Sequence, residues 1–175
     1  TLCTGGPFEA ALAAASPQRP SADGRSEDDR YVIYTGGTTG LPKGVVWRQG
    51  DAFFGCLGGG DPMRLQGEVT SPAELVERIG DGGPTYFTLA PLMHAAAQWT
   101  SFMWLFAGGK VILLDGRLDP ERVWDTVERE RPNMMTVVGD AVVKPLLDAW
   151  EAEPGRWDAS SLFAISNGGA PMSAG

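Results

Sequence analysis

The sequence predicts an α/β protein with a mostly parallel sheet and helices on both faces. From residue 71 onward, apolar strand-like segments alternate with helical segments three times. Proline, glycine and short polar residues stand where each helical segment should begin or end. Because strand–helix–strand units cross over with a right hand, such a series builds a sheet whose strands run parallel.

The chain is expected to have two parts. Residues 1–30 contain FEAALAAA (8–15), which favours a short helix, and then residues 16–30, which are rich in Pro, Ser and charged side chains and predict a surface linker. Residues 31–175 have the pattern of a folded domain. We therefore expect a leading helix and linker that run into a single domain.

The domain should begin with two strands that flank a long glycine-rich loop. YVIY (31–34) and VVW (45–47) have the apolar, β-branched and aromatic composition of strands. Residues 55–67 contain Gly58–Gly60 and then Asp61-Pro62, and they predict a loop.

Four strands are expected in the repeating part, at 85–90, 110–115, 134–138 and 162–166. In such sheets, ligands bind outside the carboxyl ends of the strands. This rule selects two loops, Pro91–His94 and Asn167–Pro171, as the place to look for a site.

The helices between these strands carry local signals. Ser71 to Glu74 reads as a capping box with Pro72 at the first helical position, and Gly80 can close that helix. A mostly apolar helix at about 95–107 should end at Gly108-Gly109.

Two further helices follow in the second half. Asp119 should cap a helix that starts at Pro120 and stops before Pro132. Asp140 should cap the last helix, which runs to about Ala152 and can be kinked by Pro145.

The strongest chemical signal is TGGTTGLPKG (35–44). Its four glycines let the backbone approach an anion closely, its three threonines add hydroxyl groups, and Lys43 adds a positive charge. This composition suits a di- or triphosphate. It is not a Walker A loop, because Lys43 precedes a glycine and strand formers follow. A plain hairpin turn is the alternative, although such turns need only two to five residues.

The overall composition excludes several classes of partner and site. A net charge of -8 and a pI near 4.6 disfavour binding to nucleic acid. The longest apolar region, 85–114, is interrupted by proline, histidine and glycines, so no integral membrane segment is expected. Cys3 and Cys56 read as free thiols of a cytoplasmic protein. One histidine, His94, cannot build a zinc site alone.

At this point the sequence resembles a known family. YTGGTTGLPKGV (34–45) resembles the signature loop of the adenylate-forming enzymes, which include acyl-CoA synthetases, peptide-synthetase adenylation domains and luciferases. Pro91–His94 resembles the histidine-bearing motif of that family, and Gly168–Pro171 resembles its adenine-side loop. The chain would then be part of the large N-terminal domain of such an enzyme.

The resemblance implies a role for each matching residue. The β- and γ-phosphates of ATP would be held by Thr35, Gly36, Gly37, Thr38, Thr39, Gly40 and Lys43. The hydroxyl of Thr35 would help to ligate Mg²⁺. His94, grouped with Lys43 as catalytic, would border the acyl carboxylate, although a lone histidine can also be a satisfied core residue. The adenine would pack on the backbone of Gly168, Gly169, Ala170 and Pro171.

The implied reaction has two steps. ATP and a carboxylic acid give an acyl-adenylate and pyrophosphate, and a thiol, usually that of coenzyme A, then displaces AMP. The match is most like bacterial fatty-acyl or steroid-side-chain CoA ligases, with peptide-synthetase adenylation domains second. A non-catalytic nucleotide-binding module from a truncated paralogue is the alternative from another class.

Two expectations concern the limits of the chain and its aromatic helix. The later motifs of the family and its C-terminal lid domain are absent from the sequence, so we expect a fragment that is inactive alone and needs the missing C-terminal part as its partner. The helix at 95–107 carries aromatic residues all round, which predicts a buried core helix more than the wall of an acyl tunnel.

Overall fold

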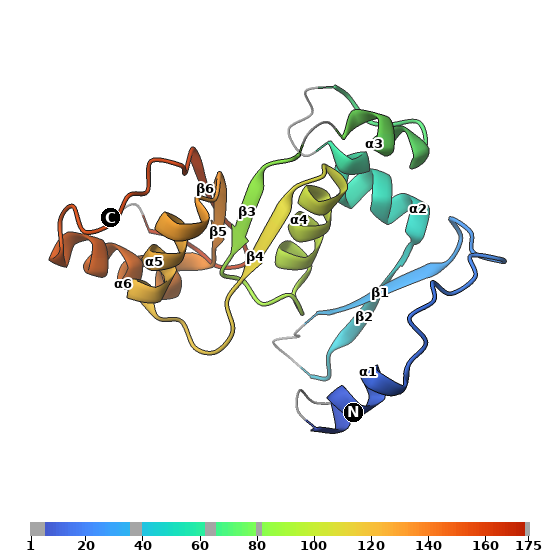
Figure 1. The fold of residues 1–175 in the computed structure, drawn as a ribbon, viewed down its shortest axis with the longest axis horizontal. Coiled ribbons are helices and arrows are strands. Elements are labelled where there is room, and N and C mark those ends of the chain that lie inside the picture. Colours follow the sequence, from blue (N-terminus) through green and yellow to red (C-terminus); the bar gives the residue numbers. More distant parts are fainter. Residues whose placement is uncertain (1–5, 36–39, 62–65, 80–81, 174–175) are drawn as a thin grey trace.

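A computed structural model describes residues 6–35, 40–61, 66–79 and 82–173, and its strands form two separate sheets (Figure 1). The helical elements are α1 (Gly6–Ala14), α2 (Gln49–Asp51), η1 (Ala52–Cys56), η2 (Gly58–Gly60), α3 (Ala73–Arg78), α4 (Ala95–Phe106), α5 (Pro120–Glu130) and α6 (Gly139–Ala152). The strands are β1 (Arg30–Thr35), β2 (Lys43–Arg48), β3 (Thr85–Thr88), β4 (Lys110–Leu113), β5 (Met134–Val137) and β6 (Ala164–Asn167).

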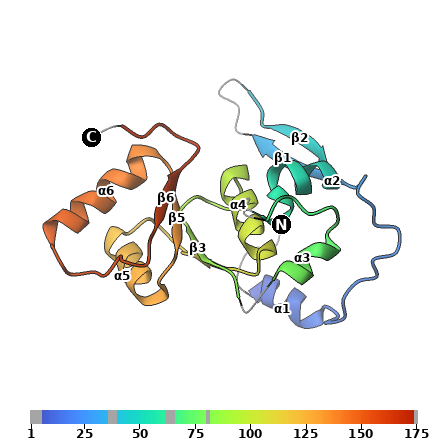
Figure 2. The same ribbon diagram turned by 90° about the horizontal axis from the view of Figure 1, so that it is seen from above.

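The larger sheet has the order β4-β3-β5-β6, and all its neighbouring strands are parallel. Successive side chains on β3 point to opposite faces. Phe87 packs in a core with residues of α5 and α6, whereas Tyr86 stacks on Trp104 of α4 with ring centroids 6.1 Å apart. Helices therefore cover both faces, as Figures 1 and 2 show, and the predicted α/β class is confirmed.

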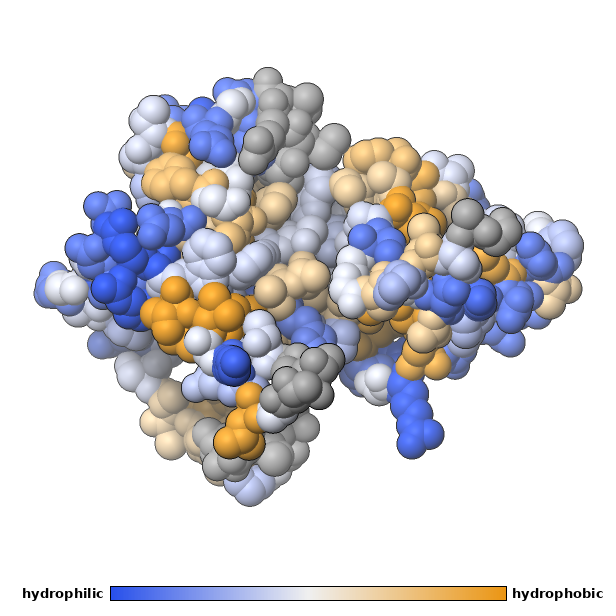
Figure 3. Space-filling model, turned by 180° about the vertical axis from the view of Figure 1, so that it is seen from behind, coloured by the Kyte–Doolittle hydropathy of each residue, from blue (hydrophilic) through white to orange (hydrophobic). Residues whose placement is uncertain are grey.

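The smaller sheet is the antiparallel hairpin of β1 and β2, in which Tyr31 is paired with Trp47 and Thr35 with Lys43. It packs on α4 near Trp99, whose ring meets that of Trp47 edge-on at a centroid distance of 5.7 Å. The outer face of the hairpin exposes Val32 and Val46 between the Arg30–Arg48 pair and the tip, and an apolar patch over the hairpin is visible in Figure 3. Both expected strands exist, and they stand apart from the parallel sheet.

Two local predictions need correction near the first helices. Residues 55–60, expected to be loop, lie largely in the helical turns η1 and η2, because Phe53 of η1 packs on Phe106 of α4 at a centroid distance of 5.8 Å. The predicted capping box at Ser71 is also wrong. Glu74 instead accepts a hydrogen bond from the backbone N–H of Thr70, at 3.1 Å. The helix begins at Ala73, and the Glu74 carboxylate binds the residue before Ser71 rather than Ser71 itself. Gly80 lies outside the described residues.

The later helices follow their signals more closely. The carboxylate of Asp119 accepts hydrogen bonds from the N–H groups of Glu121 and Arg122, and α5 ends before Pro132 with Arg131 at φ 48°. Asp140, however, does not cap α6. Gly139 already lies in the helix with φ 59°, so Asp140 falls in the first turn and its carboxylate is free to bind elsewhere.

Candidate functional site

The two loops selected by topology lie at the same edge of the parallel sheet. His94 follows β3 and is the N-cap of α4, and Gly168 follows β6. A Cβ built on Gly168 would lie 3.9 Å from Cβ of Ala96, in the first turn of α4. The N–H of Gly168 also donates to the carbonyl of Val137 at the end of β5, at 3.2 Å. The structure thus brings the His94 loop and the Gly168 loop together.

His94 itself is exposed, with φ -98° and ψ 141°. Its imidazole makes no hydrogen bond to another described residue, although its backbone N–H donates to Pro91. A position in the core is therefore excluded for His94, and its role in a site stays a prediction.

The loop at Gly168–Pro171 is held tightly against the start of α6. The Asn167 side chain accepts from the N–H of Gly139 at 2.7 Å and donates to the carbonyl of Ala170 at 2.9 Å. The N–H of Asp140 donates to the carbonyl of Pro171 at 3.3 Å. These three hydrogen bonds tie both ends of the loop to the start of α6.

Asp140 also binds Ser173, the second residue after the loop. Its two carboxylate oxygens accept from the N–H and the hydroxyl of Ser173, both at 2.8 Å, and it pairs with Lys144 at 2.9 Å. The N–H of Ser173 first, and then Lys144, lower the pKa of Asp140 to about 2. Asp140 was expected to cap α6, and Asn167 was expected only as the first residue of the candidate loop at Asn167–Pro171. An Asn ahead of Gly-Gly is typical of such a turn and was the signal available.

Three other predicted site residues, Thr35, Gly40 and Lys43, are described near the tip of the hairpin. Thr35 and Lys43 are directly opposite each other, and the Thr35 hydroxyl donates to the carbonyl of Lys43 at 3.3 Å. Both side chains are exposed, and the Lys43 ammonium has no ion pair with any residue that the structure describes. Gly40 has φ 122°, which favours glycine. Gly36, Gly37, Thr38 and Thr39 lie outside the described residues.

The hairpin face that bears Thr35 and Lys43 is the face that packs toward α4. Residues paired directly across an antiparallel ladder share a face, and that face recurs every second residue. From the tip, the face therefore carries the Thr35 and Lys43 pair, then Ile33 and Val45, and finally Tyr31 and Trp47. It changes from polar to apolar to aromatic over about 13 Å, the length of four strand residues.

An apolar cavity of about 250 Å³ lies at the aromatic end of this face. We call it the inner cavity; its walls include Tyr31, Ala52, Phe53, Trp99, Phe102 and Phe106. The Trp99 indole N–H donates to the Tyr31 hydroxyl at 3.2 Å, and that hydroxyl donates to the Gln98 side chain. These bonds join β1 to α4 at the entrance of the cavity.

The cavity changes the interpretation of α4. The prediction of a buried core helix holds only for the face toward the sheet, where Trp104 is 2% exposed. On the opposite face, Phe102 is 41% exposed and borders the inner cavity together with Trp99. The aromatic residues all round this helix therefore serve two surfaces, the core and a cavity wall.

The described residues contain no group of three or more His, Cys, Asp or Glu side chains arranged to hold a metal ion. No helix among them has the length and apolar character needed to cross a membrane. Cys56 is partly buried, and burial raises the pKa of its thiol. Cys3 lies outside the described residues.

Comparisons with known proteins agree on one family. Residues 4–175 match the family described as AMP-binding enzyme. The chain is 45% identical over 167 residues to the medium-chain acyl-CoA ligase Mig of Mycobacterium avium, and 39% identical over 171 residues to the 3-oxocholest-4-en-26-oate–CoA ligase of Rhodococcus rhodochrous. The matches cover 93% and 95% of this chain but 30% of each relative.

A solved structure shows the same fold. The inhibitor-bound N-terminal domain of FACL13 from Mycobacterium tuberculosis matches 95% of this chain and 37% of its own chain, with a TM-score of 0.67 at 24% identity. The fold is thus that of the N-terminal domain of an adenylate-forming enzyme, as the phosphate-loop motif predicted. With the family match over nearly the whole chain, the conclusion is that the chain belongs to the AMP-binding enzyme family.

Proposed function

We propose that this chain is the phosphate- and acyl-binding part of an ATP-dependent acyl-CoA ligase that activates a fatty acid or a related lipid acid. One observation carries the proposal: a single hairpin face links Thr35 and Lys43 to an apolar cavity. The relatives support it, because those named above are ligases of medium-chain acids and of a steroid acid. The chain spans about 30% of their length, so the rest of the enzyme would supply further binding groups.

The polar end of the hairpin face would hold ATP. In the first step the carboxylate oxygen of the acid attacks the α-phosphorus of ATP, and pyrophosphate leaves. Negative charge builds on the leaving pyrophosphate, and the ammonium of Lys43 would stabilise it. The loop from Thr35 to Gly40 would add N–H and hydroxyl donors. His94 would border the acid carboxylate, and the Gly168–Pro171 backbone would pack on adenine.

Mg²⁺ fits this end of the site. Magnesium is commonly held by one or two protein oxygens together with phosphate oxygens and water. The exposed hydroxyl of Thr35 is an oxygen of the right kind, beside the proposed phosphate position. A bound Mg²⁺ would neutralise phosphate charge and orient the leaving group.

The apolar end would hold the acyl chain. A carboxylate near Lys43 and His94 requires a chain that extends about 13 Å along the hairpin to reach the inner cavity. Short acids would leave that cavity empty and forfeit its apolar contacts. The thiol of coenzyme A would then attack the acyl carbonyl, a C–S bond would form, and AMP would leave. We place this reaction in the cytoplasm.

The test is made on the full-length enzyme that contains this chain. A panel of short, medium and long fatty acids and steroid acids is assayed for pyrophosphate release and for the CoA thioester. We expect both products, with longer acids preferred over short ones. Pyrophosphate without thioester would point to a carrier-protein acceptor, as in peptide synthetases. ATP binding with neither product would mean a non-catalytic nucleotide-binding module.

A further inference from the structure

The turn after the hairpin contains a short π-helix, η1, which the sequence did not predict. Its geometry is marked by the N–H of Leu57, which donates to the carbonyl of Ala52 at 3.0 Å, five residues earlier. Such π turns are rare and occur frequently at functional sites. Here the turn carries two neighbouring aromatic residues, Phe53 and Phe54, whose rings meet edge-on with centroids 4.8 Å apart.

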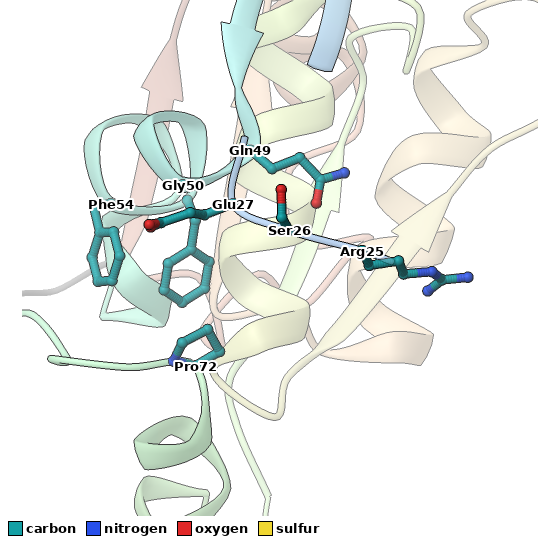
Figure 4. Close-up of a pocket in the computed structure, with 8 residues that line it drawn as sticks. Arg25, Ser26, Glu27, Gln49, Gly50, Phe54 and Pro72 are labelled. Carbon is teal, nitrogen blue, oxygen red and sulfur yellow. The ribbon is translucent and has the colours of Figure 1, made fainter. Parts of the chain in front are cut away.

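Phe53 stands between two cavities. On one side is the inner cavity, where the Phe53 ring lies 5.8 Å from that of Phe106. On the other side is a second cavity of about 370 Å³, the outer cavity, shown in Figure 4. Phe53 and Gln49 border both cavities, whereas Phe54 borders only the outer one.

The outer cavity has an apolar wall and a polar rim. Phe54 and Pro72, which are labelled in Figure 4, provide the apolar wall together with Phe53. Arg25 and Glu27, from the segment that leads into β1, provide the rim and are exposed to solvent. An acyl chain that passed Phe53 would therefore still find apolar surface before it reached water.

We propose that Phe53 closes the far end of the inner cavity and so determines the longest acyl chain that the enzyme accepts efficiently. This inference rests on the proposed function, because it takes the inner cavity as the acyl site. Removing the phenyl ring would open the inner cavity into the outer one. Additional methylenes would then be buried against Phe54 and Pro72, where the native phenyl ring blocks their way.

The test compares Phe53→Ala with Phe54→Ala in the full-length enzyme. The two substitutions remove the same atoms from adjacent positions of the same turn, and both side chains are half-buried. For a series of straight-chain saturated fatty acids, kcat/KM for thioester formation is measured against chain length. Phe53→Ala should raise the ratio of kcat/KM between the longest and the medium acids by about tenfold, since a few buried methylenes are worth that much. Phe54→Ala should leave this ratio unchanged.

The chain-length profiles of the variants and the wild type distinguish a failure of the Phe53 proposal from a failure of the proposed function. Phe53→Leu guards against a folding defect in the alanine variant and should give a smaller shift in the same direction. If the wild-type enzyme forms thioesters but Phe53→Ala and Phe53→Leu keep its chain-length profile, Phe53 is not the determinant and the proposed function stands. An equal shift in Phe54→Ala would also overturn the assignment to Phe53. If the wild-type enzyme activates no fatty acid of any length, the proposed function fails first.

Discussion

The loop at Gly168–Pro171 is fastened to α6 by hydrogen bonds on both of its flanks, whereas the hairpin tip at Thr35 and Lys43 is left open to solvent. Around the loop, Asn167 and Asp140 together form bonds to Gly139, Ala170, Pro171 and Ser173. At the described part of the tip, the Thr35 hydroxyl bond to Lys43 is the one side-chain hydrogen bond.

Under the proposed function, this difference would match the two kinds of group that a nucleotide presents. A flat, uncharged adenine gains from a rigid surface whose shape exists before binding, because ordering a loop costs about 1–2 kcal/mol per residue. A triphosphate gains most from unpaired charge and donors, since a lysine already paired with a carboxylate would have to give up that partner. Under the proposed function, the internal hydrogen bonds would therefore lie on the adenine side, and the phosphate side would stay open to solvent.

The largest effect is expected from Gly139→Ala, which attacks the fastened loop. Gly139 has φ 59°, and a Cβ there would lie 2.7 Å from Cβ of Ala170 and from the carbonyl oxygen of Pro171. We expect a loss of about 3 kcal/mol in unfolding free energy, from the left-handed backbone and the overlap together. Denaturant titration of the full-length enzyme measures it.

Gly155→Ala is the matched control for that substitution. Gly155 also has a positive φ, 81°, but a Cβ there would have no neighbour within 4 Å. It should cost only the backbone term of about 1–2 kcal/mol. Equal losses for the two variants would show that the loop moves aside freely and is not held as described.

The next effect is expected from Lys43→Ala, which removes the free charge at the hairpin tip. Hydrogen bonds to charged groups are worth about 1.5–3 kcal/mol, so pyrophosphate release at sub-saturating ATP should fall by about ten- to a hundredfold. Lys110→Ala is the control, because Lys110 pairs with Glu130 at the amino end of β4. An unchanged rate for Lys43→Ala at all ATP concentrations would remove Lys43 from the site.

Much of the parallel sheet could be predicted because its signals are local. Asp119 and Pro120 mark the start of α5, and Gly108-Gly109 follow the end of α4. Residues within one turn of these two boundaries were therefore enough to predict them. The place of the two loops followed from topology alone, since parallel strands end at one edge. The strand order β4-β3-β5-β6 could not be predicted, because it depends on which strands pair over long separations.

The missed features depend on contacts between distant residues. Asp140 binds Ser173, 33 residues away. Its carboxylate is available for this bond because α6 already begins at the left-handed Gly139, so Asp140 is not the capping residue. Phe53 borders two cavities because it packs against Phe106 of α4, 53 residues later in the sequence, whereas the glycines that follow Phe53 suggested a loop. The pairing of β1 with β2 was hidden by the length of the loop between them.

A smaller effect is expected where the hairpin meets α4. Tyr31→Phe removes the hydroxyl that accepts from Trp99 and donates to Gln98. The docking of the hairpin should weaken by about 1 kcal/mol, seen as faster amide exchange in β1. Tyr34→Phe is the control, because Tyr34 is 66% exposed on the outer face. Equal exchange rates in the two variants would show that these bonds do not hold the hairpin in place.

The smallest effect concerns the carboxylate of Asp140 and depends on pH. Its folded pKa of about 2 lies below the value of about 3.9 expected for an unfolded chain. A lowered pKa means that the stabilisation is fully present above about pH 4 and is lost as the pH falls toward 2. Asp140→Asn keeps an acceptor for the N–H of Ser173 but loses the charge that attracts Lys144. The melting temperatures of wild type and variant should therefore differ at neutral pH and converge below pH 4, and high salt should narrow the gap because the group is exposed. A gap that stays constant from neutral pH down to about 2 would show that the ionised form of Asp140 does not fasten the loop.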